Sequence, residues 1–367
     1  MFKKYRVLKW TSLFIVSVIV FVVCFWFWLK SLIPPFDKNL ELTQVKDLPY
    51  VSENIVPQRG KILAVVTSVD MMGNSDKTTG YELTELARAY YIFTANGFEV
   101  DIASPKGGKP PVVIDDEDMG AFDFAFLNDS VAQFKTSNTI PMENVVPEQY
   151  EAVYFVGGKG AMFDFPDNEA IQSLVRDYYQ SNKVVGAVCH GPSALVNVKL
   201  DNGKPLLENK TVSGFTNKEE LLLISDARTI FPFLLQDKMV EQGANFDEGS
   251  MYLDNVSHDQ NLITGQNPWS TWTLAERMIQ QMGYTPKHRE LTAEENAMKV
   301  LLDFEKNGKK QAKKMIKTIY EDNKSVDRML MAKHGIMSIM KGDLGDFPKL
   351  ISLVSFAKKC ESESEKI

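Results

Sequence analysis

The sequence predicts an α/β protein in which a mostly parallel sheet carries helices on both faces. Two observations lead to this fold class. Continuous β-branched runs such as 61–69 (KILAVVTSV) are typical of buried strands, and they alternate with segments of helical spacing such as 84–97 (TELARAYYIFTANG). The alternation recurs between Gly60 and Gly283. Crossover connections of this kind place the strands parallel to one another.

The predicted strands and helices follow one another in a regular order. The first helix ends at a capping Gly97, and the strand after it completes a βαβ unit. In such sheets, functional residues gather at the carboxyl ends of the strands. The further predicted strands are 98–104 (FEVDIAS), 150–158 (YEAVYFVGG) and 183–189 (KVVGAVC). The further predicted helices are 168–180, 190–198, 231–243 and 269–283, the last of which follows the segment 261–268 (NLITGQNP).

The first thirty residues contain one long apolar segment. Residues 10–29 (WTSLFIVSVIVFVVCFWFWL) carry no charge, and a helix of this length spans a hydrocarbon core of roughly 30 Å. A cleaved signal peptide is the alternative, but the aromatic residues 25–28 are typical of an interfacial belt. We therefore expect a single-pass membrane protein with a cytoplasmic N-terminus and an extracytoplasmic catalytic domain. The basic residues that set this orientation are Lys3, Lys4, Arg6 and Lys9.

Four segments are expected along the chain. Residues 1–33 form the cytoplasmic tip and the transmembrane anchor, and the polar residues 34–59 are interpreted as a stalk. Residues 60–284 form the catalytic domain. Residues 285–367 predict a helical C-terminal extension, interrupted at Gly308. Its lysines form a solvated face or, alternatively, a surface that touches lipid headgroups or a partner.

Composition and charge exclude several classes of protein. A hydrophobic content of 44% and a charged content of 24% are those of a folded chain. The net charge of -7 argues against nucleic acid as a partner, because phosphate binding needs a clustered positive surface. Cys24, Cys189 and Cys360 give no disulfide framework. The four histidines show no ligand spacing, so we expect neither a metal nor an organic cofactor.

Cys189 stands where a buried strand runs directly into a predicted helix. Ala187 and Gly191 are the small residues that a strained nucleophile elbow requires on either side. A helix N-terminus stabilises a thiolate, so we expect a lowered pKa for Cys189. A free cysteine can also be a small buried hydrophobe, but the adjacent His190 favours a reactive one.

A glycine-rich loop follows the strand 150–158. Gly157, Gly158 and Gly160 free backbone amides that can face an anionic oxygen. We expect this loop, including Lys159, to line the substrate site. The amides of Gly158 and His190 are the expected oxyanion hole.

Six motifs in order resemble the ThiJ/PfpI superfamily of class I glutamine amidotransferase-like proteins, and within it the branch of heat-shock glyoxalase III proteins. The resemblance covers Gly60 to about Gly283 and implies a flavodoxin-like three-layer sandwich and a role in stress response. The anchor, the stalk and the C-terminal extension lie outside it. The motifs are TTGYELTE, GFEVDIASPKGGKPP, VYFVGGKGAMFDFPDN, GAVCHGP, SGFTNKEE and DQNLITGQNP.

The resemblance implies roles for two acids. One is a glutamate that hydrogen-bonds the nucleophilic cysteine; here it is Glu85, with Glu82 less favoured. Beside a thiolate this carboxyl group should have a raised pKa and remain protonated. The other completes a Cys-His-acid arrangement, for which Glu219 is expected and Glu220 is the alternative. Lys159 stands where many relatives have a histidine, which leaves the substrate open.

The resemblance also implies a reaction. A cofactor-free, glyoxalase III-like lyase converts a small reactive carbonyl substrate, an α-oxoaldehyde such as methylglyoxal, to a hydroxy acid without glutathione. Cys189 adds to the aldehyde, and His190 or Glu85 moves the proton. An amidase, peptidase or deglycase-type hydrolase is an alternative on the same site. A holdase chaperone and a redox-stress protein are others. Relatives are frequently dimers, which leaves a homodimer open.

Overall fold

The computed structural model describes residues 2–115 and 118–364 and divides the chain into two compact units. The α/β unit comprises Asp37–Glu290. The helical unit combines the residues up to Phe36 with those from Leu291 onward. The predicted basic residues before the anchor, Lys3, Lys4, Arg6 and Lys9, have side chains outside the described part of the chain.

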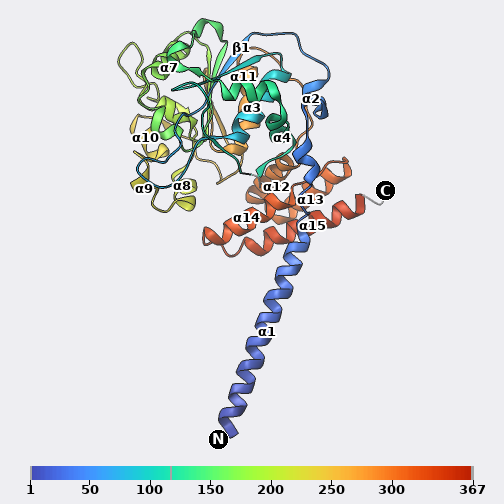
Figure 1. The fold of residues 1–367 in the computed structure, drawn as a ribbon. Helices are drawn as coiled ribbons and strands as arrows, with labels where there is room; N and C mark the ends of the chain where they lie inside the picture. Colours follow the sequence, from blue (N-terminus) through green and yellow to red (C-terminus); the bar gives the residue numbers. More distant parts are fainter. Residues whose placement is uncertain (1, 116–117, 365–367) are drawn as a thin grey trace. The chain divides into compact units, whose positions relative to one another are not determined.

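A seven-stranded sheet runs through the α/β unit (Figure 1). Its strands are β1 (Lys61–Val65), β3 (Glu99–Ser104), β5 (Ile140–Pro141), β6 (Ala152–Phe155), β7 (Val184–Val188), β10 (Val256–Asp259) and β11 (Leu262–Gly265). Their order is β10-β11-β7-β6-β1-β3-β5, and every neighbouring pair is parallel except β10 with β11. The parallel sheet is therefore confirmed. The short antiparallel edge strand β10 was not predicted, because VSHD has no apolar run.

Two small strand pairs lie beside this sheet. The pairs are β2 (Tyr81–Glu82) with β4 (Val112–Val113), and β8 (Thr211–Val212) with β9 (Asn245–Phe246). Their length of two residues gives no periodic signal in the sequence.

Helices cover both faces of the sheet, so β6 and β7 are buried at every residue. In Figure 1, α3, α4 and α11 lie on one side, and α7 and α10 lie on the other. The helices are α3 (Leu83–Ala95), α4 (Ala121–Asn128), α5 (Ser130–Ser137), α6 (Ala161–Asp164), α7 (Glu169–Gln180), α8 (Asn217–Leu223), α9 (Ala227–Ile230), α10 (Leu235–Glu241) and α11 (Thr271–Gln281). The predicted helix at 190–198 is instead a short 3-10 helix, η6 (Gly191–Leu195).

The chain between the anchor and the first strand is not the expected stalk. From Asp37 onward it folds onto the α/β unit, where Leu48 is buried in the core. The Nδ2 group of Asn128 donates to the carbonyl oxygens of Glu41 and Thr43, at 2.9 Å each. The few apolar residues here follow no period, which is why the sequence did not predict this packing. The segment forms η1 (Lys38–Leu42), η2 (Val45–Asp47) and α2 (Pro49–Ser52).

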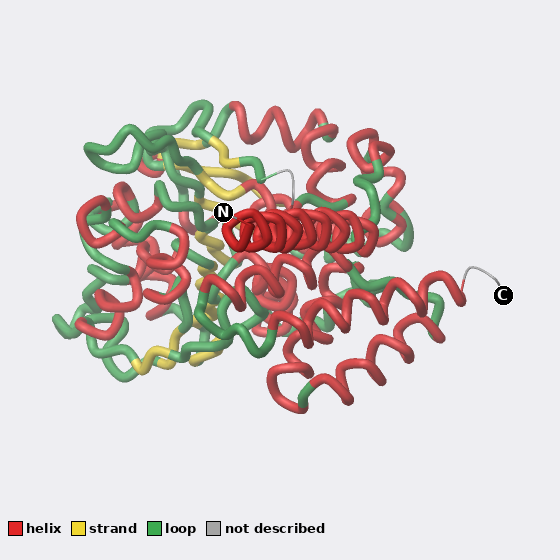
Figure 2. The backbone as a smooth tube through the Cα atoms, turned by 90° about the horizontal axis from the view of Figure 1, so that it is seen from below, coloured by secondary structure: helices red, strands yellow, loops and turns green. Residues whose placement is uncertain are grey.

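The helical unit contains the predicted C-terminal helices. Its helices are α1 (Phe2–Leu32), α12 (Ala293–Asn307), α13 (Lys309–Glu321), α14 (Arg328–Met340) and α15 (Phe347–Ser364). Gly308, at a positive φ of 79°, separates α12 from α13 as expected. The long helix α1 is seen from below in Figure 2. Its segment Leu13–Leu32 is long and apolar enough to cross a membrane, by length and composition.

Candidate active site

Cys189 occupies a strained turn at the carboxyl end of β7. Its φ of 58° lies in the left-handed region, which L-residues adopt at a cost. Two hydrogen bonds fix this turn. The amide of Cys189 donates to the carbonyl oxygen of Gly265 at 2.9 Å, and the amide of Phe215 donates to the carbonyl oxygen of Cys189 at 2.8 Å. Gly191 has no room for a side chain, because a Cβ atom would meet the carbonyl oxygen of Phe155. The strained turn that the sequence predicted after this strand is confirmed.

The imidazole of His190 connects the cysteine to a carboxylate. Its Nδ1 atom lies 3.3 Å from Sγ of Cys189, and its Nε2 atom lies 2.6 Å from Oε2 of Glu220. All three side chains are buried. The ring packs against Phe215 and Phe231, with centroid distances of 4.5 and 6.3 Å. The sequence did not identify these two aromatic residues, although Phe215 lies within the SGFTNKEE motif.

Glu219, the expected third member, has a structural role instead. Its Oε2 atom accepts hydrogen bonds from the amide and the hydroxyl of Thr216, which is the N-cap of α8. Its Oε1 atom accepts from the amide of Tyr252 and from the side-chain amides of Gln266 and Asn267. Both oxygens are therefore committed, and the assignment moves from Glu219 to its neighbour Glu220.

Glu85 contacts the cysteine as the family resemblance implied. Its carboxyl group is hydrogen-bonded to Cys189, and its Oε2 atom accepts the amide hydrogen of Gly157 at 2.7 Å. Burial, followed by the charge of Glu82, raises the pKa of Glu85 well above its usual value. The raised pKa favours the protonated form of this acid, which is the expected direction. The hydroxyl of Tyr154 donates to its backbone carbonyl at 2.9 Å and fixes its place on α3.

The expectation of a low pKa for Cys189 is wrong. Burial, then the charge and the hydrogen bond of Glu85, raise the pKa of this thiol well above its usual value, and only Lys159 opposes them. Cys189 is only 4% exposed. The helix that follows it, η6, is too short to supply a strong helix dipole. The resting site therefore holds a thiol. A thiolate forms when the Sγ proton passes to Nδ1 of His190.

Glu220 is set up to stabilise the imidazolium that this transfer creates. Burial by itself would raise the pKa of Glu220, but the charge of His190 and its hydrogen bond hold that pKa below its usual value. A carboxylate that stays ionised in a buried position favours a positive charge on the ring beside it.

The glycines of the predicted oxyanion loop differ in what they contact. The amide of Gly157 is occupied by Glu85, so it does not face a substrate oxygen. The amides of Gly158 and His190 have no partner among the described residues, and both remain candidates for the oxyanion hole. Gly158 has a φ of 98°. A Cβ atom on Gly160 would lie 2.6 Å from the methyl group of Thr67, so this residue serves packing.

Lys159 adds a positive charge to this group of acids. Its ammonium lowers the pKa of Cys189, Glu85 and Glu220 relative to what burial alone would produce. It also counteracts burial at the half-buried Glu82, whose pKa is raised to about 7. Within residues 2–115 and 118–364, no group of three or more His, Cys, Asp or Glu side chains is arranged to hold a metal ion.

The fold and this site define a class of α/β proteins in which a cysteine after a central parallel strand is flanked by a histidine and a buried acid. A family model places the chain within this class. The model of the DJ-1/PfpI family matches residues 77–281, more than half of the chain, and the chain belongs to this family.

Several relatives of this chain are named as glyoxalases. Glutathione-independent glyoxalase HSP31 of Saccharomyces cerevisiae is 31% identical over 235 residues, which are 60% of this chain and 96% of that protein. The crystal structure of glyoxalase III from Candida albicans is 26% identical with a TM-score of 0.57, and the match covers 60% of this chain and 97% of that one. The structure of Rapid Encystment Protein 24 KDa from Francisella tularensis is 38% identical with a TM-score of 0.58, covering 61% and 99%.

Proposed function

We propose that this chain is a glutathione-independent glyoxalase that converts α-oxoaldehydes of the methylglyoxal type to 2-hydroxy acids. The observation that carries the proposal is the hydrogen-bonded series from Sγ of Cys189 through His190 to Glu220, with Glu85 bonded to the same sulfur. This arrangement offers a nucleophile, a base and an acid at one point. The activity named for the relatives agrees with it.

The first step is the addition of the thiol to the aldehyde carbon. Nδ1 of His190 accepts the Sγ proton while the carbon–sulfur bond forms and the carbonyl π bond breaks. The negative charge on the former carbonyl oxygen faces the amides of Gly158 and His190, and the oxygen then takes up a proton to give a hemithioacetal. The carboxylate of Glu220 stabilises the imidazolium in the interval.

The second step moves a hydrogen between the two carbons of the bound substrate. A base removes the proton from the carbon attached to sulfur, an enediol forms, and the neighbouring carbon accepts a proton to give a thioester. His190 fits the role of the base, and the protonated Glu85 fits that of the acid. One water molecule then cleaves the thioester into the hydroxy acid and the free thiol. The sum is an internal oxidation and reduction plus one water, so no oxidant is consumed.

The experiment uses the purified full chain in detergent with methylglyoxal and no glutathione. Lactate formed by the wild type and by Cys360→Ala, but not by Cys189→Ala, supports the proposal; Cys360 is a buried cysteine of the helical unit and serves as the control. A folded wild type that makes no lactate but hydrolyses a model amide or ester would overturn it in favour of a hydrolase. Suppression of aggregation that survives in Cys189→Ala, without turnover in the wild type, would instead indicate a chaperone.

We also propose that α1 anchors this enzyme in a membrane, with the N-terminus in the cytoplasm and the α/β unit on the opposite side. The apolar segment Leu13–Leu32 and the aromatic residues 25–28 support the anchor, and the basic residues before it support the orientation. Protease added to intact spheroplasts should digest a tag at the C-terminus and spare a tag at the N-terminus. The reverse pattern would contradict the orientation, and release of both tags with the soluble fraction would contradict the anchor.

A further inference from the structure

Every exposed residue of α14 is apolar. Along its thirteen residues, all of which are described, the exposed side chains are those of Met329, Ile336, Ile339 and Met340. Ile336 and Met340 are 52% and 57% exposed. A helix on a protein surface ordinarily turns polar side chains toward water. We call these four residues the α14 face. An exposed apolar surface of this kind is typical of a site that contacts another protein or a membrane.

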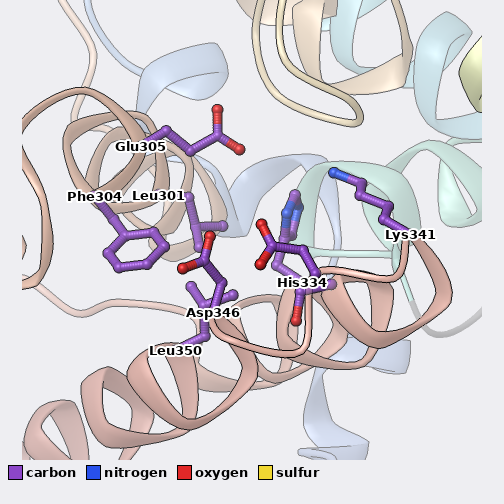
Figure 3. Close-up of a pocket in the computed structure, with 9 residues that line it drawn as sticks. Leu301, Phe304, Glu305, His334, Lys341, Asp346 and Leu350 are labelled. Atoms are coloured by element: carbon purple, nitrogen blue, oxygen red, sulfur yellow. The ribbon is translucent and has the colours of Figure 1, made fainter.

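The opposite side of α14 is already occupied within the helical unit. His334 and Ser338 are buried there and line a pocket together with residues of α12 and α15, among them Phe304 and Leu350 (Figure 3). Met331 and Leu330 are also buried. The opposite side of α14 therefore packs in the helical bundle. The α14 face does not belong to the core of that bundle.

The start of α14 is fixed to the end of the apolar helix α1. Arg328, the first residue of α14, donates from Nη1 to the carbonyl oxygen of Leu32 at 2.7 Å and pairs through Nη2 with Glu361 at 2.6 Å. The ammonium of Lys358 on α15 donates to the carbonyl oxygen of Ser31. The last carbonyls of a helix have no partner within it, and cationic donors suit the negative end of its dipole.

This attachment sets the depth of α14 relative to a membrane that α1 crosses. Leu32 follows Trp28, the last of the consecutive aromatic residues, by four positions, which is roughly 6 Å of helix. The headgroup layer on each side of the hydrocarbon core is about 5–8 Å thick. Aromatic belts mark the inner boundary of that layer. The beginning of α14 therefore lies within the headgroup layer, and in Figure 1 the helix runs across the direction of α1.

We propose that the α14 face docks on the phospholipid bilayer, with its four apolar side chains at the boundary between headgroups and acyl chains. A lipid surface fits better than a second copy of the chain, because the α14 face continues from the end of the membrane-spanning segment. This inference rests on the proposed anchor and is independent of the reaction at Cys189.

The test uses the full chain reconstituted in vesicles of phosphatidylcholine and phosphatidylglycerol. A trace of phospholipid carries a photoactivatable diazirine near its glycerol, and labelled peptides are identified by mass spectrometry. The peptide of α14 should be labelled at least about fivefold more than that of α13, whose exposed side is rich in lysine. The peptide of α1 is the positive control.

Matched variants make the result specific to the α14 face. Ile336→Glu combined with Met340→Glu should reduce the label to the level of α13, because charged side chains at these two exposed positions oppose contact with an apolar phase without being buried in the bundle. Val131→Glu combined with Phe134→Glu, at equally exposed apolar positions of α5, should leave it unchanged. Label on α1 without label on α14 would overturn the docking, as would cross-links between two copies through α14. Absence of label from both helices would overturn the docking together with the anchor.

Discussion

Nε2 of His190 lies 2.6 Å from Oε2 of Glu220, while the adjacent Glu219 points its carboxylate at the N-cap of the same helix. Consecutive residues on a helix are rotated by about 100°, so two neighbouring glutamates face different surroundings. Glu220 meets the imidazole, and Glu219 holds Thr216, Tyr252 and two side-chain amides. One residue acts on the ring of the reaction centre, and the other stabilises the loop that surrounds it.

Replacement of Glu220 by Gln should lower kcat by roughly 100-fold, because a neutral amide no longer stabilises the imidazolium. Glu220 acts through His190, so the pH profile is the decisive readout. The acid limb of kcat/KM should change, because the variant lacks the carboxylate of Glu220, whose pKa the charge and hydrogen bond of His190 hold below its usual value. An unchanged pH profile with a reduced rate would indicate a structural role alone. The Glu219→Gln variant is the control: it should lower the thermal midpoint, through the loss of buried hydrogen bonds, without that shift.

Replacement of Glu85 by Gln should lower the pKa of Cys189. The charge that Glu85 carries when it is ionised and its hydrogen bond both raise that pKa, and glutamine carries no charge at any pH. The rate of alkylation by iodoacetamide, followed against pH, measures the change, and each unit of pKa gives about a tenfold faster reaction below the pKa. Turnover should fall in the same variant, because the proton donor is lost. A slower alkylation than in the wild type would mean that Glu85 stabilises the thiolate instead.

Replacement of Lys159 by Met should have the opposite effect on the thiol. The ammonium of Lys159 lowers the pKa of Cys189, so its removal raises that pKa and slows alkylation at neutral pH. Because its charge acts across the site without a hydrogen bond to the sulfur, we expect a change of only about three- to tenfold. Lys159→Arg keeps the charge and serves as the control. Equal rates in Lys159→Met and the wild type would show that solvent screens this charge.

The sequence predicted the parts of the fold that carry a periodic signal. The runs that became β1, β6 and β7 are continuous and mostly apolar, and β3 places apolar residues between the half-buried Glu99 and Asp101. The helix α7 has one apolar face, whereas α3 is apolar along most of its length and is buried on nearly all sides. The segment from Asp37 to Arg59 has neither property, and only tertiary contacts such as those of Leu48 order it. The same holds for the two-residue strands, whose partners lie far away in the chain.

The sequence predicted which residues form the candidate site better than it predicted their orientations and pKa values. Cys189, His190 and Glu85 follow from the elbow pattern and the family motifs, and they meet as expected. The choice between Glu219 and Glu220 depends on the rotation of a short helix, which no spacing rule gives. The raised pKa of Cys189 depends on the depth of burial, which also needs the folded structure.

Glu82 should make the stability of the protein depend on pH. Burial raises its pKa to about 7, against roughly 4.3 in an unfolded chain. Between these values the folded protein holds a proton that the unfolded chain has released, so the free energy of unfolding falls as the pH rises, and it levels off above about 7. Glu82→Gln carries no such proton. The difference in thermal midpoint between variant and wild type should therefore grow from pH 4.5 to 7, and a constant difference would contradict the shift.

Breaking the buried ion pair of Arg88 and Asp123 should cost more stability than breaking an exposed pair. Their closest atoms, Nη2 and Oδ2, are 3.1 Å apart, both side chains are 2% exposed, and the guanidinium lies 5.0 Å from the ring centre of Trp269. Asp123→Ala leaves a buried cation without its carboxylate, so we expect a loss of about 3–5 kcal/mol. The exposed pair of Lys204 and Glu208 is the control, and Glu208→Ala should cost about 0.5 kcal/mol or less. Denaturant unfolding of both variants measures the two losses. Similar small losses would mean that water reaches the Arg88 guanidinium once its carboxylate is removed.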